Sequence, residues 1–186
     1  MKILMVLDRE FPPDLRVENE IDAMLRSGHE VHLACYTRKD KPFLEKSGSL
    51  TIHRRPISGF TYKSSVAALS LPFYFSFWKE FLTGILQQGP FDVVHVHDLP
   101  LTGPCVELKK KYGLRLIADL HENWPAFVRM SKHTNTPAGK LLSPVFLWHA
   151  APPPSGYING PDAACGRAPG LRHRATGRGV CVRLRS

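Results

Sequence analysis

The chain has 186 residues, of which 43% are hydrophobic and 22% charged, the composition of a globular protein with a core of its own. The formal net charge is +9, but more than half of this excess lies in the last 37 residues, so it does not indicate one basic surface for nucleic acid. The four cysteines form no CxxC pair, which excludes the common zinc spacings, and the N-terminal apolar run is too short for a signal peptide. We therefore expect a cytoplasmic protein without nucleic-acid partners.

Apolar runs alternate with helical periodicity along most of the chain. Residues 2–7 (KILMVL) are typical of a buried parallel strand, and residues 14–27 repeat apolar side chains at helical spacing up to Gly28. The same patterns predict further strands at 30–36, 49–56, 91–97 and 114–120, and further helices at 101–112 and 138–149. Strands that alternate with helices indicate βαβ units. We therefore predict an α/β protein with a Rossmann-like, doubly wound parallel sheet.

Residues 66–86 (VAALSLPFYFSFWKEFLTGIL) are the most hydrophobic stretch of the chain. A membrane-spanning helix needs about 20 successive apolar residues. Lys79 and Glu80 interrupt this stretch, and Pro72 breaks its first part. We predict a helix that packs against the core, and peripheral contact with the inner face of the membrane through 66–86 stays open.

The composition changes near residue 150. All eleven lysines precede residue 141, and Ala, Gly, Pro and Arg supply 23 of the 37 residues from Ala150 onward. The codons of these four amino acids carry G or C at both of their first two positions, so translation of a GC-rich gene out of frame would give this composition. We predict a folded domain at 1–149 and a disordered tail at 150–186, produced by loss of the reading frame. A natural basic tail is the alternative.

The polar residues that need an explanation follow the predicted strands. Ligands of doubly wound sheets bind beyond the carboxyl ends of the strands, which here selects loops 8–16, 97–104 and 119–129. His95 and His97 in FDVVHVHDLP share one strand face because side chains alternate along a strand. This HxHD pattern is similar to that of metal-dependent hydrolases. Further ligands for such a site would come from the DLHE segment, if the two strands are neighbours: Asp119, His121 and Glu122.

Other catalytic signals are absent from the sequence. It contains no GxGxxG, no GxxxxGK[ST] and no GxSxG segment, so neither a phosphate cradle nor a nucleophile elbow is predicted. Arg16, near the start of the first predicted helix, is a candidate to hold an anionic group with help from the helix dipole. An ion pair with Glu20 explains Arg16 equally well.

Three segments together carry a family resemblance: DLRVENE with the following GHEVH, HVHDLP, and DLHENWP. In this order and spacing they resemble the N-terminal half of nucleotide-sugar-dependent glycosyltransferases of the GT-B fold, in the retaining group called family 4 or group 1. The resemblance covers about residues 1–149. It implies a Rossmann-like acceptor-side domain that faces a second, donor-binding domain across a cleft.

The resemblance also implies site residues and partners. His97 matches the histidine that family members place near the reacting sugar, and Asp98 is the neighbouring acid, so these two are the expected catalytic residues. The expected acceptor-binding residues are Asp14, Arg16, Asp119, His121 and Glu122. The implied substrates are a sugar nucleotide and a glycan or lipid-linked acceptor. Neither a metal nor a cofactor is expected.

Two departures from the family pattern matter. The first loop reads EFPPDLRVE and lacks the glycine pair that lets the backbone approach the donor phosphates. No second βαβ series and no E-x7-E donor motif follow residue 149, so we expect this chain to be inactive alone. A non-catalytic module that binds a glycan or a partner is the alternative, with a metal-dependent hydrolase that uses His95, His97 and Asp98 as a further one.

Overall fold

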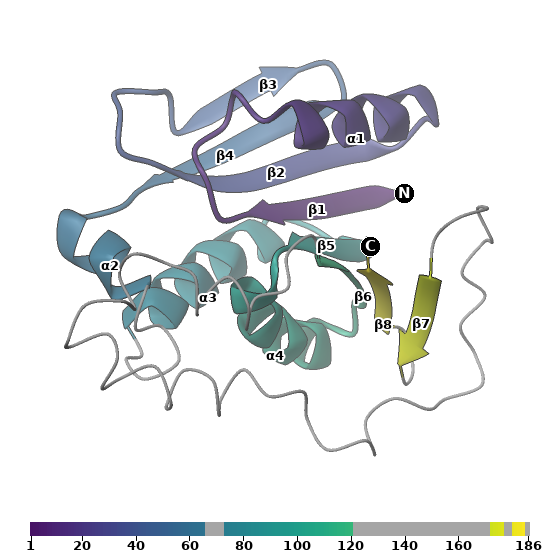
Figure 1. The fold of residues 1–186 in the computed structure, drawn as a ribbon. Coiled ribbons are helices and arrows are strands. Elements are labelled where there is room, and N and C mark those ends of the chain that lie inside the picture. Colours follow the sequence, from purple (N-terminus) through teal and green to yellow (C-terminus); the bar gives the residue numbers. More distant parts are fainter. Residues whose placement is uncertain (66–72, 121–171, 177–179, 185–186) are drawn as a thin grey trace.

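The computed structural model describes residues 1–65, 73–120, 172–176 and 180–184. Its strands form one sheet in the order β3-β4-β2-β1-β5-β6-β8-β7 (Figure 1). The strands are β1 (Lys2–Leu7), β2 (Glu30–Thr37), β3 (Leu44–Ser47), β4 (Leu50–Pro56), β5 (Val93–His97), β6 (Arg115–Leu120), β7 (Arg172–Thr176) and β8 (Val180–Leu184). All neighbours from β4 to β8 pair in parallel, whereas β3 and β7 pair antiparallel at the two edges.

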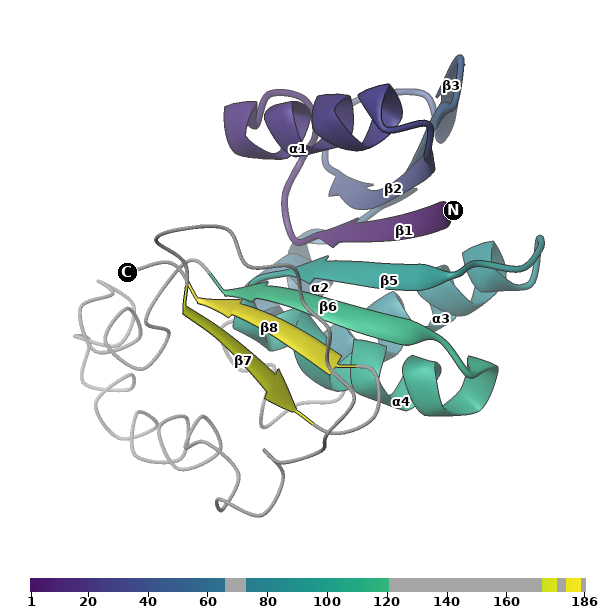
Figure 2. The ribbon, with the colours of Figure 1, turned by 90° about the vertical axis from the view of Figure 1, so that its right-hand side faces the viewer.

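Helices cover both faces of this sheet, as Figure 2 shows. They are α1 (Leu15–Arg26), α2 (Gly59–Ser64), α3 (Phe73–Leu86) and α4 (Thr102–Tyr112), with a short 3-10 turn, η2 (Leu99–Leu101), before α4. The arrangement confirms the predicted α/β class and the doubly wound parallel sheet.

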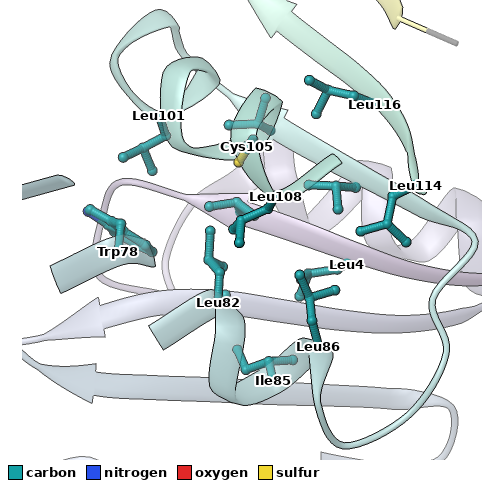
Figure 3. Packing of buried hydrophobic residues seen from close by; sticks show 14 of the residues in the cluster. Leu4, Trp78, Leu82, Ile85, Leu86, Leu101, Cys105, Leu108, Leu114 and Leu116 are labelled. Atoms are coloured by element: carbon teal, nitrogen blue, oxygen red, sulfur yellow. The ribbon is translucent and has the colours of Figure 1, made fainter. Parts of the chain in front are cut away.

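Alternate residues of β1 enter two different cores. Met5 and Leu7 pack with Val17 and Ile21 of α1 on one face of the sheet. Leu4 and Val6 belong to the larger core on the other face, which α3 and α4 complete. Figure 3 shows this larger core, where these labelled side chains of α3 and α4 meet the strands: Trp78, Leu82, Ile85, Leu86, Cys105 and Leu108.

Helix α1 begins where its sequence provides a cap. The Asp14 carboxylate accepts a hydrogen bond from the Val17 N–H (3.3 Å), and the Glu18 carboxylate accepts one from the Asp14 N–H (3.0 Å). The helix ends before Gly28, whose φ of 75° lies in the left-handed region that glycine adopts without strain. These local signals explain why the predicted span of 14–27 matches α1 closely.

The described part of the 66–86 stretch confirms the predicted core-facing helix. Its residues 73–86 form α3, and the side chains that it buries are Tyr74, Trp78, Leu82, Ile85 and Leu86. None of the helices in the described residues has both the length and the apolar character that a bilayer crossing requires.

Four elements differ from the sequence-based expectation. Strand β3 and helix α2 were not predicted, because both are short and β3 exposes all four of its side chains. Strands β7 and β8 lie in the segment 150–186, for which disorder was expected, and β8 pairs with β6. Backbone hydrogen bonds to an open sheet edge do not require an alternating apolar pattern, so the composition of the tail gave no sign of these strands. The predicted helix at 138–149 lies outside the described residues.

Candidate active site at the strand ends

The candidate site lies where β1, β5 and β6 end. These three strands are parallel neighbours, with β5 between the other two, so their carboxyl ends lie side by side at one edge of the sheet (Figure 2). Asp8 follows β1 directly, Asp98 follows β5, and Asp119 is the penultimate residue of β6. The topology thus brings together polar residues that are up to about 110 positions apart in the sequence.

His95 and His97 lie on the same face of β5, as the alternation of strand side chains predicts. Their ring centroids are 4.6 Å apart, and both side chains are buried, His97 completely. In the parallel ladder His97 pairs with Asp119, which is also completely buried. Strands β5 and β6 are thus neighbours, which was the condition for the DLHE segment to approach the histidines, and Asp119 lies beside them.

Helix α1 adds Glu20 to the group formed by His95, His97 and Asp119. From the sequence, Glu20 was expected only as an ion-pair partner of Arg16. The Glu20 Oε2 atom lies 3.8 Å from His97 Nε2, and the Glu20 side chain is 14% exposed. One potential ligand atom from each of Glu20, His95, His97 and Asp119 lies within 4.8 Å of the others. Helical spacing is the sequence feature that could have identified Glu20. It follows the buried Val17 by three positions and precedes the buried Ile21, so it lies near the buried face of α1.

Asp98 lies next to this cluster but is not a member of it. Its φ of 69° is in the left-handed region, where aspartate is tolerated better than most side chains. The Asp98 N–H donates to the Asp119 carbonyl (3.0 Å), and the Asp98 carbonyl accepts a hydrogen bond from the Thr102 hydroxyl (3.4 Å). Asp98 is half-buried and so can contact a ligand at the strand ends, whereas His97 is completely buried and could do so only after a rearrangement.

Asp8 is a further acidic group that the sequence analysis did not single out. The Tyr74 hydroxyl of α3 donates a hydrogen bond to its carboxylate. Burial raises the pKa of Asp8 to about 7, and the charge of Asp98 adds to this effect, whereas the Tyr74 hydrogen bond opposes it. Asp8 thus offers a carboxyl group that exchanges protons near neutral pH at the strand ends. The signal in the sequence was its position directly after a buried strand.

The remaining predicted acceptor residues divide into two groups. Asp14 and Arg16 lie at the start of α1, in the connection that follows β1, where Arg16 Nη2 is 3.7 Å from Asp14 Oδ2. The Arg16 side chain is 23% exposed, and its guanidinium lies near the Asp14 carboxylate that caps α1. An ion pair was one of the two interpretations of Arg16, but the expected partner was Glu20. His121 and Glu122 lie outside the described residues.

Comparisons with known proteins agree with this arrangement. The sequence profile described as Glycosyltransferase Family 4 matches residues 16–152. No curated protein gives a significant sequence match. The similar solved structures include sucrose-phosphate synthase from Thermosynechococcus elongatus, at a TM-score of 0.55 and 11% identity over 78% of this chain and 39% of that chain.

Two further structures have the same fold. A trehalose-6-phosphate structure from E. coli, bound with UDP-2-fluoro glucose, has a TM-score of 0.53 and 12% identity over 100% of this chain and 48% of that one. An α,α-trehalose-phosphate synthase (UDP-forming) from Burkholderia vietnamiensis has a TM-score of 0.52 and 14% identity over 99% and 47%. The chain thus spans less than half the length of these three structures. The fold is the Rossmann-like one found in the N-terminal half of GT-B enzymes.

Proposed function

The chain belongs to glycosyltransferase family 4, and from this premise we propose that it is the acceptor-side domain of a retaining enzyme that transfers a hexosyl unit from a sugar nucleotide to a hydroxyl group. The single observation that carries the proposal is the family match over residues 16–152, which includes Arg16, the HVHD segment and Asp119. The GT-B fold of the described residues supports it, because that fold places an acceptor at the carboxyl ends of these strands.

Asp98 is the residue that we place at the acceptor hydroxyl. It is half-buried, and its position is fixed by two backbone hydrogen bonds to neighbouring elements. A carboxylate held in this way can accept a hydrogen bond from the hydroxyl and orient it for attack. His97 lies completely buried behind Asp98, so its part in the proposal is to shape the strand end on which Asp98 is held. Asp8 adds a carboxyl group at the end of β1.

The donor side of the reaction belongs to residues beyond the described part of the chain. The E. coli structure with a similar fold is bound with UDP-2-fluoro glucose, and we propose a sugar nucleotide as the donor here by analogy. The departing diphosphate needs positive groups to stabilise its charge, which family members take from a second domain. These 186 residues span less than half the length of the similar solved structures, and we propose that alone they do not turn over a sugar nucleotide.

We propose that the change of composition near residue 150 reflects loss of the reading frame. The experiment is to translate the underlying DNA after residue 149 in its other two frames. A continuation with alternating strand and helix patterns supports the proposal, and stop codons in both frames contradict it. The continued chain is then assayed with a panel of sugar nucleotides for release of nucleoside diphosphate.

Two outcomes of that assay test the chemistry. We expect transfer by the continued chain with retention of the anomeric configuration, which NMR of the product shows directly, and no transfer by residues 1–186. Asp98→Asn should lower kcat by about 10²-fold or more, because general base assistance typically contributes this much. An inverted product, or full activity of Asp98→Asn, would overturn the mechanism.

Membrane contact through residues 66–86 is a separate proposal. In the described part of this stretch the buried side of α3 packs into the core, while Phe73 and the nearby Phe60 of α2 remain exposed and stack edge to face with centroids 5.5 Å apart. A lipid-linked acceptor would bring the enzyme to this surface. Co-sedimentation with anionic liposomes, compared between wild type and Phe60→Ser, tests the contact.

A further inference from the structure

Four side chains with metal-ligating atoms converge at the carboxyl ends of β5 and β6. Two are imidazoles on β5, one is a carboxylate on β6, and one is a carboxylate on α1. Their ligand atoms lie within 4.8 Å of one another, and His97 Nε2 and Glu20 Oε2 are 3.8 Å apart. We propose that Glu20, His95, His97 and Asp119 bind one divalent transition-metal ion, with Zn²⁺ as the best-fitting ion. The proposal goes beyond the glycosyl transfer and does not depend on it.

The donor set determines the class of ion. Two imidazoles and two carboxylates suit Zn²⁺ and its neighbours, whereas Ca²⁺ and Mg²⁺ prefer oxygen ligands alone and Cu⁺ prefers sulfur. Bonds from Zn²⁺ to nitrogen and oxygen are about 2.0–2.2 Å, which places tetrahedral ligand atoms roughly 3.5 Å apart. The Glu20–His97 separation is close to that value. The other separations among the four ligand atoms are at most 4.8 Å.

The backbone holds three of the four groups in place. His95 and His97 are two positions apart on one strand, so they share a face, and the parallel ladder places Asp119 opposite His97. All three side chains are buried in the sheet, where few rotamers are available to them.

The position of the cluster gives the ion a structural consequence. It would join α1 to β5 and β6, elements that are distant in sequence. It would also be next to Asp98, because Asp98 follows the ligand His97 and its N–H donates a hydrogen bond to the carbonyl of the ligand Asp119. A bound ion would therefore stiffen the strand end that presents Asp98, without itself touching an acceptor.

A second buried histidine pair provides an internal control. His32 Nδ1 lies 2.8 Å from His53 Nε2, and His32 Nε2 lies 2.8 Å from Glu30 Oε1. This pair lies on β2 and β4, on the other side of β1 from the proposed site. The His32–His53 pair also consists of two imidazoles, but one ring nitrogen of each is hydrogen-bonded to the other ring.

The experiment measures metal binding by the 186-residue chain itself. Protein freed of any affinity tag and of metal is titrated with Zn²⁺ by calorimetry and with Co²⁺ by visible absorption. We expect one equivalent to bind, a tetrahedral Co²⁺ spectrum, and a rise in Tm of roughly 5–10 °C at a hundredfold excess over Kd. Glu20→Gln and Asp119→Asn, which keep the size of each side chain, should each weaken binding at least about tenfold.

Matched controls decide between this site and any other. Asp98→Asn removes the carboxylate next to the cluster, and His53→Gln disrupts the other histidine pair; both should leave the affinity within about twofold of wild type. Circular dichroism without metal shows whether each variant folds. Absence of saturable binding to the folded wild-type chain overturns the proposal, as does binding that is lost in His53→Gln but kept in both ligand variants.

Discussion

Asp8, Asp98 and His53 show how single residues acquire unusual properties from their surroundings. Asp8 and Asp98 follow neighbouring strands, and burial raises the pKa of Asp8 to about 7, to which the charge of Asp98 contributes. Asp98 takes a left-handed backbone conformation at the same place. His53 is held neutral by burial and by His32. Each property makes a prediction for that residue.

The first residue-scale prediction concerns Asp8. Its pKa is raised from 3.8 to about 7 in the folded chain, so folding favours the protonated form, and this part of the stability is lost as the pH rises from about 4 through 7. Asp8→Asn, which imitates the protonated group, should make the chain more stable than wild type at pH 8, with little difference at pH 4. Urea unfolding at both pH values measures this.

Tyr74→Phe provides a control for the same group. The Tyr74 hydroxyl lowers the pKa of Asp8, so its removal should move the titration of Asp8 to higher pH, as NMR of the carboxyl carbon would show. An unchanged or lower pKa in Tyr74→Phe would contradict the assignment.

The second residue-scale prediction concerns His53. Burial, with the charge of His32, lowers its pKa from 6.5 to about 4. The stability of the neutral form is thus fully present above pH 6.5 and is lost as the pH falls from 6.5 toward 4. His53→Gln should flatten the dependence of Tm on pH in this window. Calorimetric scans at several pH values test this, and an equally steep dependence in the variant would refute it.

The third residue-scale prediction concerns the backbone of Asp98. A β-branched side chain is strained at a φ of 69°, so Asp98→Val should reduce the free energy of unfolding by about 1–2 kcal/mol, whereas Asp98→Asn should stay close to wild type. Chemical denaturation of the two variants makes the comparison. Equal stability of the two variants would argue against the left-handed conformation.

At the scale of elements, local signals were sufficient where an element is long and apolar on one side. The cap at Asp14 and the stop at Gly28 delimit α1, and the continuous apolar run of β1 indicates a strand buried on both faces. Short elements at the edges were missed, because β3 exposes its side chains and so has no apolar pattern to detect. Glu20 lies within α1, where a charged residue usually faces solvent, so its position in the sequence indicated only an ion pair with Arg16.

The element-scale prediction concerns the buried side of α3. Leu82 is 1% exposed in the core between this helix and the sheet, so Leu82→Ala should destabilise the chain by about 2–5 kcal/mol through lost burial and a cavity. Leu15, on α1, is 73% exposed, and Leu15→Ala should change the free energy of unfolding by less than about 0.5 kcal/mol. Denaturant unfolding of both variants tests the packing; equal effects would contradict it.

At the scale of the whole molecule, both hydrophobic cores lie within the first 118 residues of the described chain. A stop codon at position 150 removes β7 and β8 from the edge of β6, whereas every buried side chain that the described residues contribute to the two cores precedes residue 119. We therefore expect the shortened chain to unfold cooperatively, with a free energy of unfolding within about 1 kcal/mol of the full chain. Loss of the cooperative transition would show that the C-terminal strands are part of the folding unit.

The sequence by itself determined the class of the fold, the order of its main elements and the family, because apolar periodicity, capping residues and the three motif segments are all local features of the chain. Only the tertiary structure decided which of the polar residues meet. The parallel ladder sets Asp119 beside His97, and the packing of α1 brings Glu20 to them, whereas Asp98 next to this cluster stays only half-buried. Such contacts depend on strand neighbours and helix packing, which spacing along the chain does not encode.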